Sequence, residues 1–163
     1  MQLIVNEVLG NGTKVEQEFT TLKPHSIERV RCHVCFIDID KATNPGSITL
    51  ELFQDTTLLA TKTYTFDELV LLSDFGSALQ STSAQWHGYL SFVWDAPANI
   101  REGVYILKMS ASYTFSAAVN WIGWIKEHDD MKYDTYSGDA FPVLLQEEVP
   151  HSFEIYTYTK IST

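Results

Sequence analysis

The chain has 163 residues, 45% hydrophobic and 20% charged, a balance typical of one globular domain over residues 1–163 and unlike a disordered chain. Eleven lysines and arginines against 21 aspartates and glutamates give a net charge of −10, which argues against nucleic acid or an anionic membrane as a partner. No stretch approaches the roughly 20 apolar residues of a membrane span, and the N-terminus has no signal-peptide pattern, so we expect cytosolic synthesis.

The first two predicted strands cover residues 13–22 and 27–39. Lys23-Pro24 separates them, because proline cannot donate a backbone hydrogen bond to a sheet. In the second strand an apolar series at even positions, Val30, Cys32, Val34 and Phe36, gives way to an odd one, Ile37 and Ile39. A β-bulge near Phe36 and Ile37 would exchange the two faces in this way, because it adds one residue to one strand.

Two cysteines, Cys32 and Cys35, form a C-x-x-C motif inside the second predicted strand. Residues three apart on a strand point to opposite faces, so the two thiols are poorly placed to share a metal ion or form a disulfide. A zinc site would also need two further ligands at suitable spacing, and only scattered histidines are available. We therefore expect both cysteines to be free.

Residues 47–65 predict a β-hairpin followed by a short helix. Ile48, Leu50 and Leu52 alternate with polar residues, which is the period of a strand with one buried face. A short turn at residues 55–57 leads into the second strand. Thr65 and Glu68 fit the capping box T-x-x-E, so a helix of about two turns is predicted over 66–73.

A strand apolar on both faces is predicted over 86–94, followed by a turn region over 95–103 that contains Pro97. The next stretch, residues 104–115, alternates between apolar and polar positions along its length. Such alternation indicates a strand with one buried face, and a long strand of this kind followed closely by an apolar one is typical of the centre of an antiparallel sandwich.

The C-terminal third begins with an apolar strand over 119–126 and ends with a closing strand over 152–161. Between them, residues 127–149 form the longest irregular segment, and loops of this length usually carry function or an interface. The whole pattern predicts a single jelly-roll-like antiparallel β-sandwich of eight or nine strands, with the short helix near 66–73.

Four motifs in the C-terminal third follow one another as GVYIL from Gly103, NWIGW from Asn120, YSGDA from Tyr136 and SFEIY from Ser152. This order resembles a β-sandwich module of bacterial and phage surface proteins that is similar to carbohydrate-binding jelly rolls. The resemblance covers roughly residues 100–158, with His151-Ser152 where that pattern has Asp-Leu. It implies a non-catalytic module on a cell surface, a fibre or a virion, and a phage particle is the setting we expect.

The irregular segment also holds the densest group of acidic residues. Carboxylates and loop carbonyls are the ligands that Ca²⁺ requires, although the spacing here matches no EF-hand. A solvated acidic loop is the alternative. We otherwise expect no metal and no cofactor, and the weak Ca²⁺ candidates are Asp129, Asp130, Asp134 and Asp139.

Aromatic residues are the candidates for binding a ligand or a partner, because exposed rings can stack on a sugar or pack against a protein. For each ring the alternative is burial in the sandwich. Trp121 and Trp124 lie three apart, so on a regular strand at least one of them faces the core. The candidate ligand-binding residues are Trp86, His87, Trp124, Tyr133 and Tyr136, and the candidate interface residues are Tyr156 and Tyr158.

No pattern of catalytic residues emerges, since G-x-S-x-G, H-E-x-x-H and phosphate-binding glycine loops are all missing from the sequence. We therefore expect no enzyme. The prediction is a structural or accessory protein of a phage virion, such as a capsid decoration, tail or fibre component, that contacts other virion proteins or copies of itself. The alternative is a carbohydrate-binding module for a cell-surface glycan.

Overall fold

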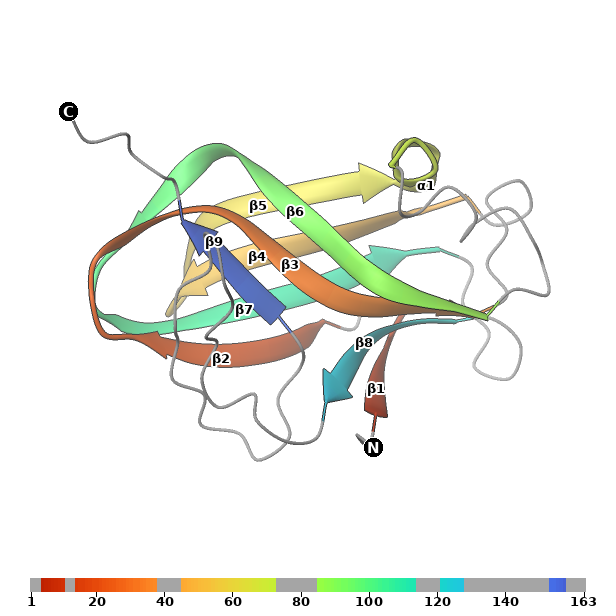
Figure 1. The fold of residues 1–163 in the computed structure, drawn as a ribbon, viewed down its shortest axis with the longest axis horizontal. Coiled ribbons are helices and arrows are strands. Elements are labelled where there is room, and N and C mark those ends of the chain that lie inside the picture. Colours follow the sequence, from red (N-terminus) through yellow and green to blue (C-terminus); the bar gives the residue numbers. More distant parts are fainter. Residues whose placement is uncertain are drawn as a thin grey trace.

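The computed structural model describes residues 4–10, 14–37, 45–72, 85–113, 121–127 and 153–157. In these ranges nine strands and one short helix form two antiparallel sheets that face each other (Figure 1). One sheet has the order β1 (Ile4–Leu9), β8 (Trp121–Glu127), β3 (His25–Ile37) and β6 (Gln85–Ile100). The other has the order β2 (Val15–Thr21), β7 (Gly103–Ser112), β4 (Ser47–Gln54) and β5 (Thr57–Thr65).

The strand order follows a simple rule. Strand β1 pairs with β8, β2 with β7, β3 with β6, and β4 with β5, always antiparallel. The chain therefore resembles one long hairpin that has been rolled up, so that successive pairs fall alternately into the two sheets. This is the eight-stranded jelly roll, and it confirms the fold class predicted from the sequence.

A ninth strand, β9 (Phe153–Thr157), extends the first sheet without changing this order. It pairs with residues 27–32 of β3, whereas β8 pairs with residues 34–37 of the same strand. Strand β3 is thus paired with β6 on one edge and with β8 and β9 in succession on the other, as Figure 1 shows for β9.

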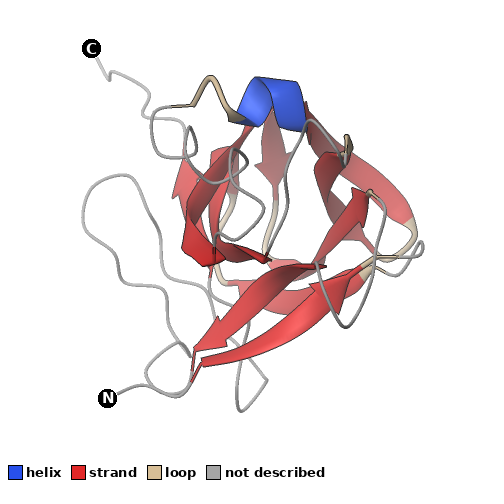
Figure 2. Cartoon of the chain, turned by 90° about the vertical axis from the view of Figure 1, so that its right-hand side faces the viewer, coloured by secondary structure: helices blue, strands red, loops and turns tan. Residues whose placement is uncertain are grey.

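The core lies between the two layers, which are seen end-on in Figure 2. Strands β2, β4 and β7 alternate between buried and more exposed residues, as expected for a sheet with one covered face. The rings of Phe19 and Tyr105 stack with centroids 5.8 Å apart. The largest fully buried side chains among the described residues are Trp124, Tyr105, Phe19, Phe36, Phe66 and Phe92, each less than 2% exposed.

The predicted hairpin and capping box are both present. Strands β4 and β5 pair around a turn at Asp55-Thr56, where Asp55 has a positive φ of 54°, a conformation that aspartate tolerates better than most residues. Helix α1 (Phe66–Leu69) begins after Thr65, whose hydroxyl accepts from the Glu68 N–H at 3.2 Å while the Thr65 N–H donates to the Glu68 carboxylate at 3.0 Å. The helix is shorter than the predicted 66–73 and lies at one end of the sandwich (Figures 1 and 2).

The predicted turn region over 95–103 is wrong for most of its length, because β6 continues to Ile100. The register explains how a strand can contain Pro97. Arg29 pairs with Val93 and Ile27 with Ala98, so residues 94–97 lie opposite a single residue of β3. Proline is accommodated in such a bulge because its missing N–H is not needed for the regular ladder.

One further expectation is wrong, and one strand was missed. The bulge predicted near Phe36 and Ile37 is not there, since the pairing of β3 with β6 and β8 continues without a shift as far as Ile37. The shift lies between Ile27 and Arg29 instead. Strand β1 was not predicted, because the apolar residues of Ile4–Leu9 do not alternate.

Polar contacts fix two places where the sheets meet. The Tyr64 hydroxyl on β5 donates to the Ser91 carbonyl on β6 at 3.0 Å, which links the two edge strands. At the β6–β7 turn, the Tyr105 hydroxyl donates to the Arg101 carbonyl at 2.8 Å and accepts from the Arg101 N–H at 3.0 Å. The Thr21 hydroxyl on β2 donates to the same carbonyl at 2.9 Å, so side chains from both β2 and β7 hydrogen-bond to this turn.

Candidate functional site

The structure tests few of the residues predicted to bind a ligand. Trp86 and His87 lie in β6, where they pair with Phe36 and Cys35, and only their backbone is described. Tyr156 is likewise placed by backbone pairing alone, opposite Arg29. The predicted residues that lie outside the described ranges are Tyr133, Tyr136, Tyr158, Asp129, Asp130, Asp134 and Asp139.

Trp124 is the exception, and the expectation that it binds a ligand is wrong. Its backbone pairs with Val34 on one side and Glu7 on the other, which places it in the middle of the first sheet. Its side chain is 0% exposed and belongs to the core between the sheets. A ring in this position is not available to a ligand at the surface. Nothing is described of the Trp121 side chain.

Within the described part of the chain, no group of three or more histidine, cysteine, aspartate or glutamate side chains is placed to hold a metal ion. In the same part, no helix is long and apolar enough to cross a membrane.

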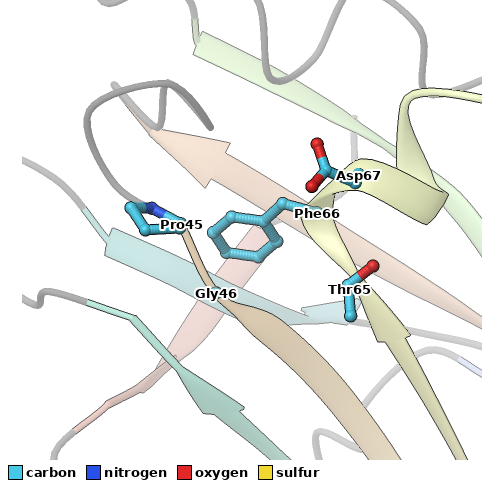
Figure 3. Close-up of a pocket in the computed structure, with 5 residues that line it drawn as sticks. All are labelled: Pro45, Gly46, Thr65, Phe66 and Asp67. Atoms are coloured by element: carbon cyan, nitrogen blue, oxygen red, sulfur yellow. The ribbon is translucent and has the colours of Figure 1, made fainter.

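A hollow of about 210 Å³ lies beside α1, at the end of the sandwich where β4 begins. It is lined by Pro45, Gly46, Thr65, Phe66 and Asp67, and the ring of Phe66 points toward Pro45 and Gly46 (Figure 3). This volume is below the roughly 300–1,000 Å³ of most small-molecule sites. Phe66 is only 1% exposed, so the aromatic surface offered to a ligand is small.

An aromatic and cationic cluster lies on the side of β3 and β6 that faces away from the core. His33 stacks on its cross-strand partner Tyr89 with ring centroids 4.6 Å apart, and the Arg31 guanidinium carbon lies 4.2 Å from the centre of the same Tyr89 ring. His33 is 6% exposed, although it points away from the sandwich interior. The central part of β3 is therefore buried on both faces.

Cys35 lies on the same outward side of β3 as His33, and its burial makes the thiol unreactive. Both cysteines are free, as predicted, and both are buried. The Cys35 thiol donates to the Gly123 carbonyl with a sulfur–oxygen distance of 3.8 Å. Burial raises the pKa of this thiol from 9.0 to about 11, with the Gly123 hydrogen bond acting in the opposite direction. Because the thiolate is the nucleophile, Cys35 is a poor one near neutral pH.

The pKa of Cys35 predicts a loss of stability in alkali. The folded state holds the thiol proton more tightly than the unfolded state, so this contribution is complete below pH 9 and is lost as the pH rises through about 11. We expect the free energy of unfolding to fall by about 2 kcal/mol over this interval. Urea unfolding followed by circular dichroism, with Cys35→Ala as the matched control, measures it. An equal pH dependence in both proteins would contradict the assignment.

The outward face of the β2-β7-β4-β5 sheet is divided into three zones along its strands. An apolar zone lies at the end near the β4–β5 and β6–β7 turns. There Phe53 pairs with Leu58 on one side and Ile106 on the other, and Val104 follows Ile106 on the same face. Leu58 is 46% exposed and Val104 is 49% exposed, so these apolar side chains are in contact with solvent.

A charged zone crosses the middle of the same face. Lys108 pairs with Glu16 on β2 and with Glu51 on β4, and its Nζ lies 3.2 Å from a Glu16 carboxylate oxygen. Lys14 reaches Glu51 with an N–O distance of 2.8 Å. The Lys108 Nζ also lies 4.5 Å from the centre of the Phe53 ring, which connects the charged zone to the apolar one.

A hydroxyl zone completes the face at the end near α1. The hydroxyls of Thr49 and Thr63 are 2.8 Å apart across β4 and β5, and Thr49 pairs with Ser110 on the other side. Among the described residues, this face carries Lys14 and Lys108 against three glutamates, Glu16, Glu18 and Glu51. Its net charge of −1 contrasts with −10 for the chain, so this is a nearly neutral surface of an acidic protein.

No protein-family model matches the chain, and no curated protein matches it. Among solved structures, it is weakly similar to the infectious bursal disease virus Gt strain, with 12% identity and a TM-score of 0.33 over 97% of this chain and 40% of that chain. The VP2 subviral particle of that virus has 13% identity and a TM-score of 0.33, over 96% of this chain and 39% of that chain. The T13 particle of the virus has 9% identity and a TM-score of 0.32, over 93% of this chain and 31% of that chain. The chain spans less than half the length of these viral chains.

Proposed function

We propose that the chain is a structural protein of a virus particle, which acts through protein–protein contacts and catalyses no reaction. The observation that carries the proposal is the jelly-roll strand order, because this fold recurs in viral capsid domains and in lectins. A fold supports a function by analogy only, so the surfaces have to decide between these two uses.

The surface favours assembly over ligand binding. The outward face of the second sheet is nearly neutral, and it exposes apolar side chains at Leu58 and Val104. Such a face suits contact with another protein surface. We propose a phage virion, assembled in the host cytoplasm, as the setting, with other virion proteins or further copies of the chain as partners. The net charge of −10 argues against a role in contacting nucleic acid.

A carbohydrate-binding module is the second candidate, since lectins share the fold. Binding a sugar requires exposed rings beside polar groups, and Trp86, Tyr133 and Tyr136 remain candidates for that role. The burial of Trp124 removes one of the rings on which this alternative depends.

The test is to ask whether the chain is part of a particle. Particles purified on a density gradient from the source culture are analysed by quantitative mass spectrometry and by an antibody against the recombinant chain. We expect the chain to sediment with the particles in a fixed ratio to the major capsid protein. A chain that stays at the top of the gradient would overturn the proposal, and a saturable tryptophan fluorescence response to one sugar of a glycan panel would favour the alternative.

A further inference from the structure

We propose that two copies of the chain pack face to face through the outward face of the β2-β7-β4-β5 sheet. The two-fold axis would run along the strands, between β7 and β4. This inference rests on the proposed assembly role, for which it supplies a surface and a partner. A two-fold interface uses the same patch on both copies, so the patch must be complementary to itself. The side-chain pattern of this face meets that condition.

The geometry follows from the strand order. A two-fold axis along the strands reverses the order of the strands in the facing copy, so β7 lies over the partner's β4 and β2 lies over the partner's β5. Each row of cross-strand neighbours then faces the same row of the partner, read in the opposite direction. The register of the sheet shows which side chains meet.

In the apolar zone the row runs Glu18, Ile106, Phe53, Leu58. Reversal places Ile106 against the partner's Phe53 and Phe53 against the partner's Ile106. Leu58 then faces the aliphatic stem of the partner's Glu18, whose carboxylate can stay in water at the rim. The apolar side chains of both copies are covered together.

In the charged zone the row runs Glu16, Lys108, Glu51, Thr61. Reversal places Lys108 against the partner's Glu51 and Glu51 against the partner's Lys108, so two opposite-charge pairs form. A two-fold axis that crosses the strands at this row would instead place Glu16, Lys108 and Glu51 each against the same residue of the partner, which brings like charges together. The charges therefore select the axis along the strands.

The hydroxyl zone is compatible with the same axis. Its row runs Ser110, Thr49, Thr63 from β7 to β5, and reversal brings Ser110 against the partner's Thr49. Hydroxyl groups can donate or accept, so they adapt to this contact without an unpaired charge. The net charge of −1 on this face also keeps the repulsion between two acidic molecules small at the contact.

The area indicates a weak dimer. Four strands about 4.8 Å apart and about eight residues long, at about 3.4 Å per residue, give roughly 500 Å² per copy and about 1,000 Å² in total. This is the lower limit for a specific interface. A contact of this size is populated at high local concentration, which is the condition inside a growing particle.

Exchanging the charges between copies tests the proposal. Sedimentation velocity is measured from about 1 µM to about 1 mM chain. We expect the average mass of the wild type to rise from 18.5 kDa toward twice that value. Glu51→Lys and Lys108→Glu each place like charges against each other, so each alone is expected to weaken the dimer about tenfold or more. An equimolar mixture of the two is expected to recover the dimer, because each variant supplies the charge that the other lacks.

The matched control is Asp95→Lys, which makes the same change in charge as Glu51→Lys at an exposed position of β6, away from the face. It is expected to associate like the wild type, and circular dichroism confirms that all variants are folded. A mixture that stays as dissociated as its two components overturns the proposed surface. A wild type that stays monomeric overturns self-association. In both cases particle sedimentation still decides the assembly role independently.

Discussion

Replacing Trp124 with alanine is expected to lower the free energy of unfolding by about 4 kcal/mol, because the change removes the largest fully buried side chain of the core. The ring lies between the two sheets on a strand that is paired on both edges, so the surrounding backbone has little room to collapse into the space. Urea unfolding followed by far-ultraviolet circular dichroism measures the loss without depending on tryptophan emission.

Leu22→Ala is the control for this experiment, since Leu22 is 66% exposed and its loss is expected to change stability by less than about 0.5 kcal/mol. A loss of under about 1 kcal/mol for Trp124→Ala would mean that the ring is not packed in the core. In that case Trp124 would return as a candidate ligand-binding residue.

Gly46→Ala is expected to cost about 3 kcal/mol, because an added Cβ meets backbone rather than a flexible side chain. It would lie 2.1 Å from the Ser112 carbonyl oxygen and 2.9 Å from the Tyr113 Cβ. The Gly46 carbonyl also accepts a hydrogen bond from the Phe66 N–H at 2.9 Å. Relief of the clash would therefore pull β4 away from both β7 and α1.

The melting temperature reports this effect, and the expected decrease is about 6–12 °C for a domain of this size. Ser47→Ala, at the next position and on the outward face, is the matched control and should melt close to the wild type. Equal melting temperatures for Gly46→Ala and Ser47→Ala would show that Gly46 does not approach Ser112 closely.

The sequence was informative wherever one face of a strand is buried. Alternation in β4 and β7 predicted the side chains that face the core, and the pair Thr65 and Glu68 predicted the start of α1. Both signals are local, because they depend on residues a few positions apart. The spacing of Cys32 and Cys35 was equally local and correctly predicted two free thiols.

What the sequence could not predict depends on partners far along the chain. The bulge that accommodates Pro97 is set by which residue of β3 lies opposite, and no pattern within β6 contains that register. The same holds for the second covered face of β3, where His33 is buried although its side chain points away from the core. The three zones of the outward face combine residues from four strands. The alternation within each strand predicts which side chains point outward, but it does not predict which strands lie side by side.

The pairing of early strands with late ones also has a kinetic consequence. The hairpin of β4 and β5 closes over two residues, whereas Ile4 must find Glu127 before β1 is placed. Contacts so distant along the chain give a high contact order, and folding on the millisecond-to-second scale or slower is the norm for such topologies. During synthesis β1, β2 and β3 have to wait for β8, β7 and β6 to leave the ribosome. Until then their unpaired edges can be captured by other chains, so expression at low temperature should raise the yield of native protein.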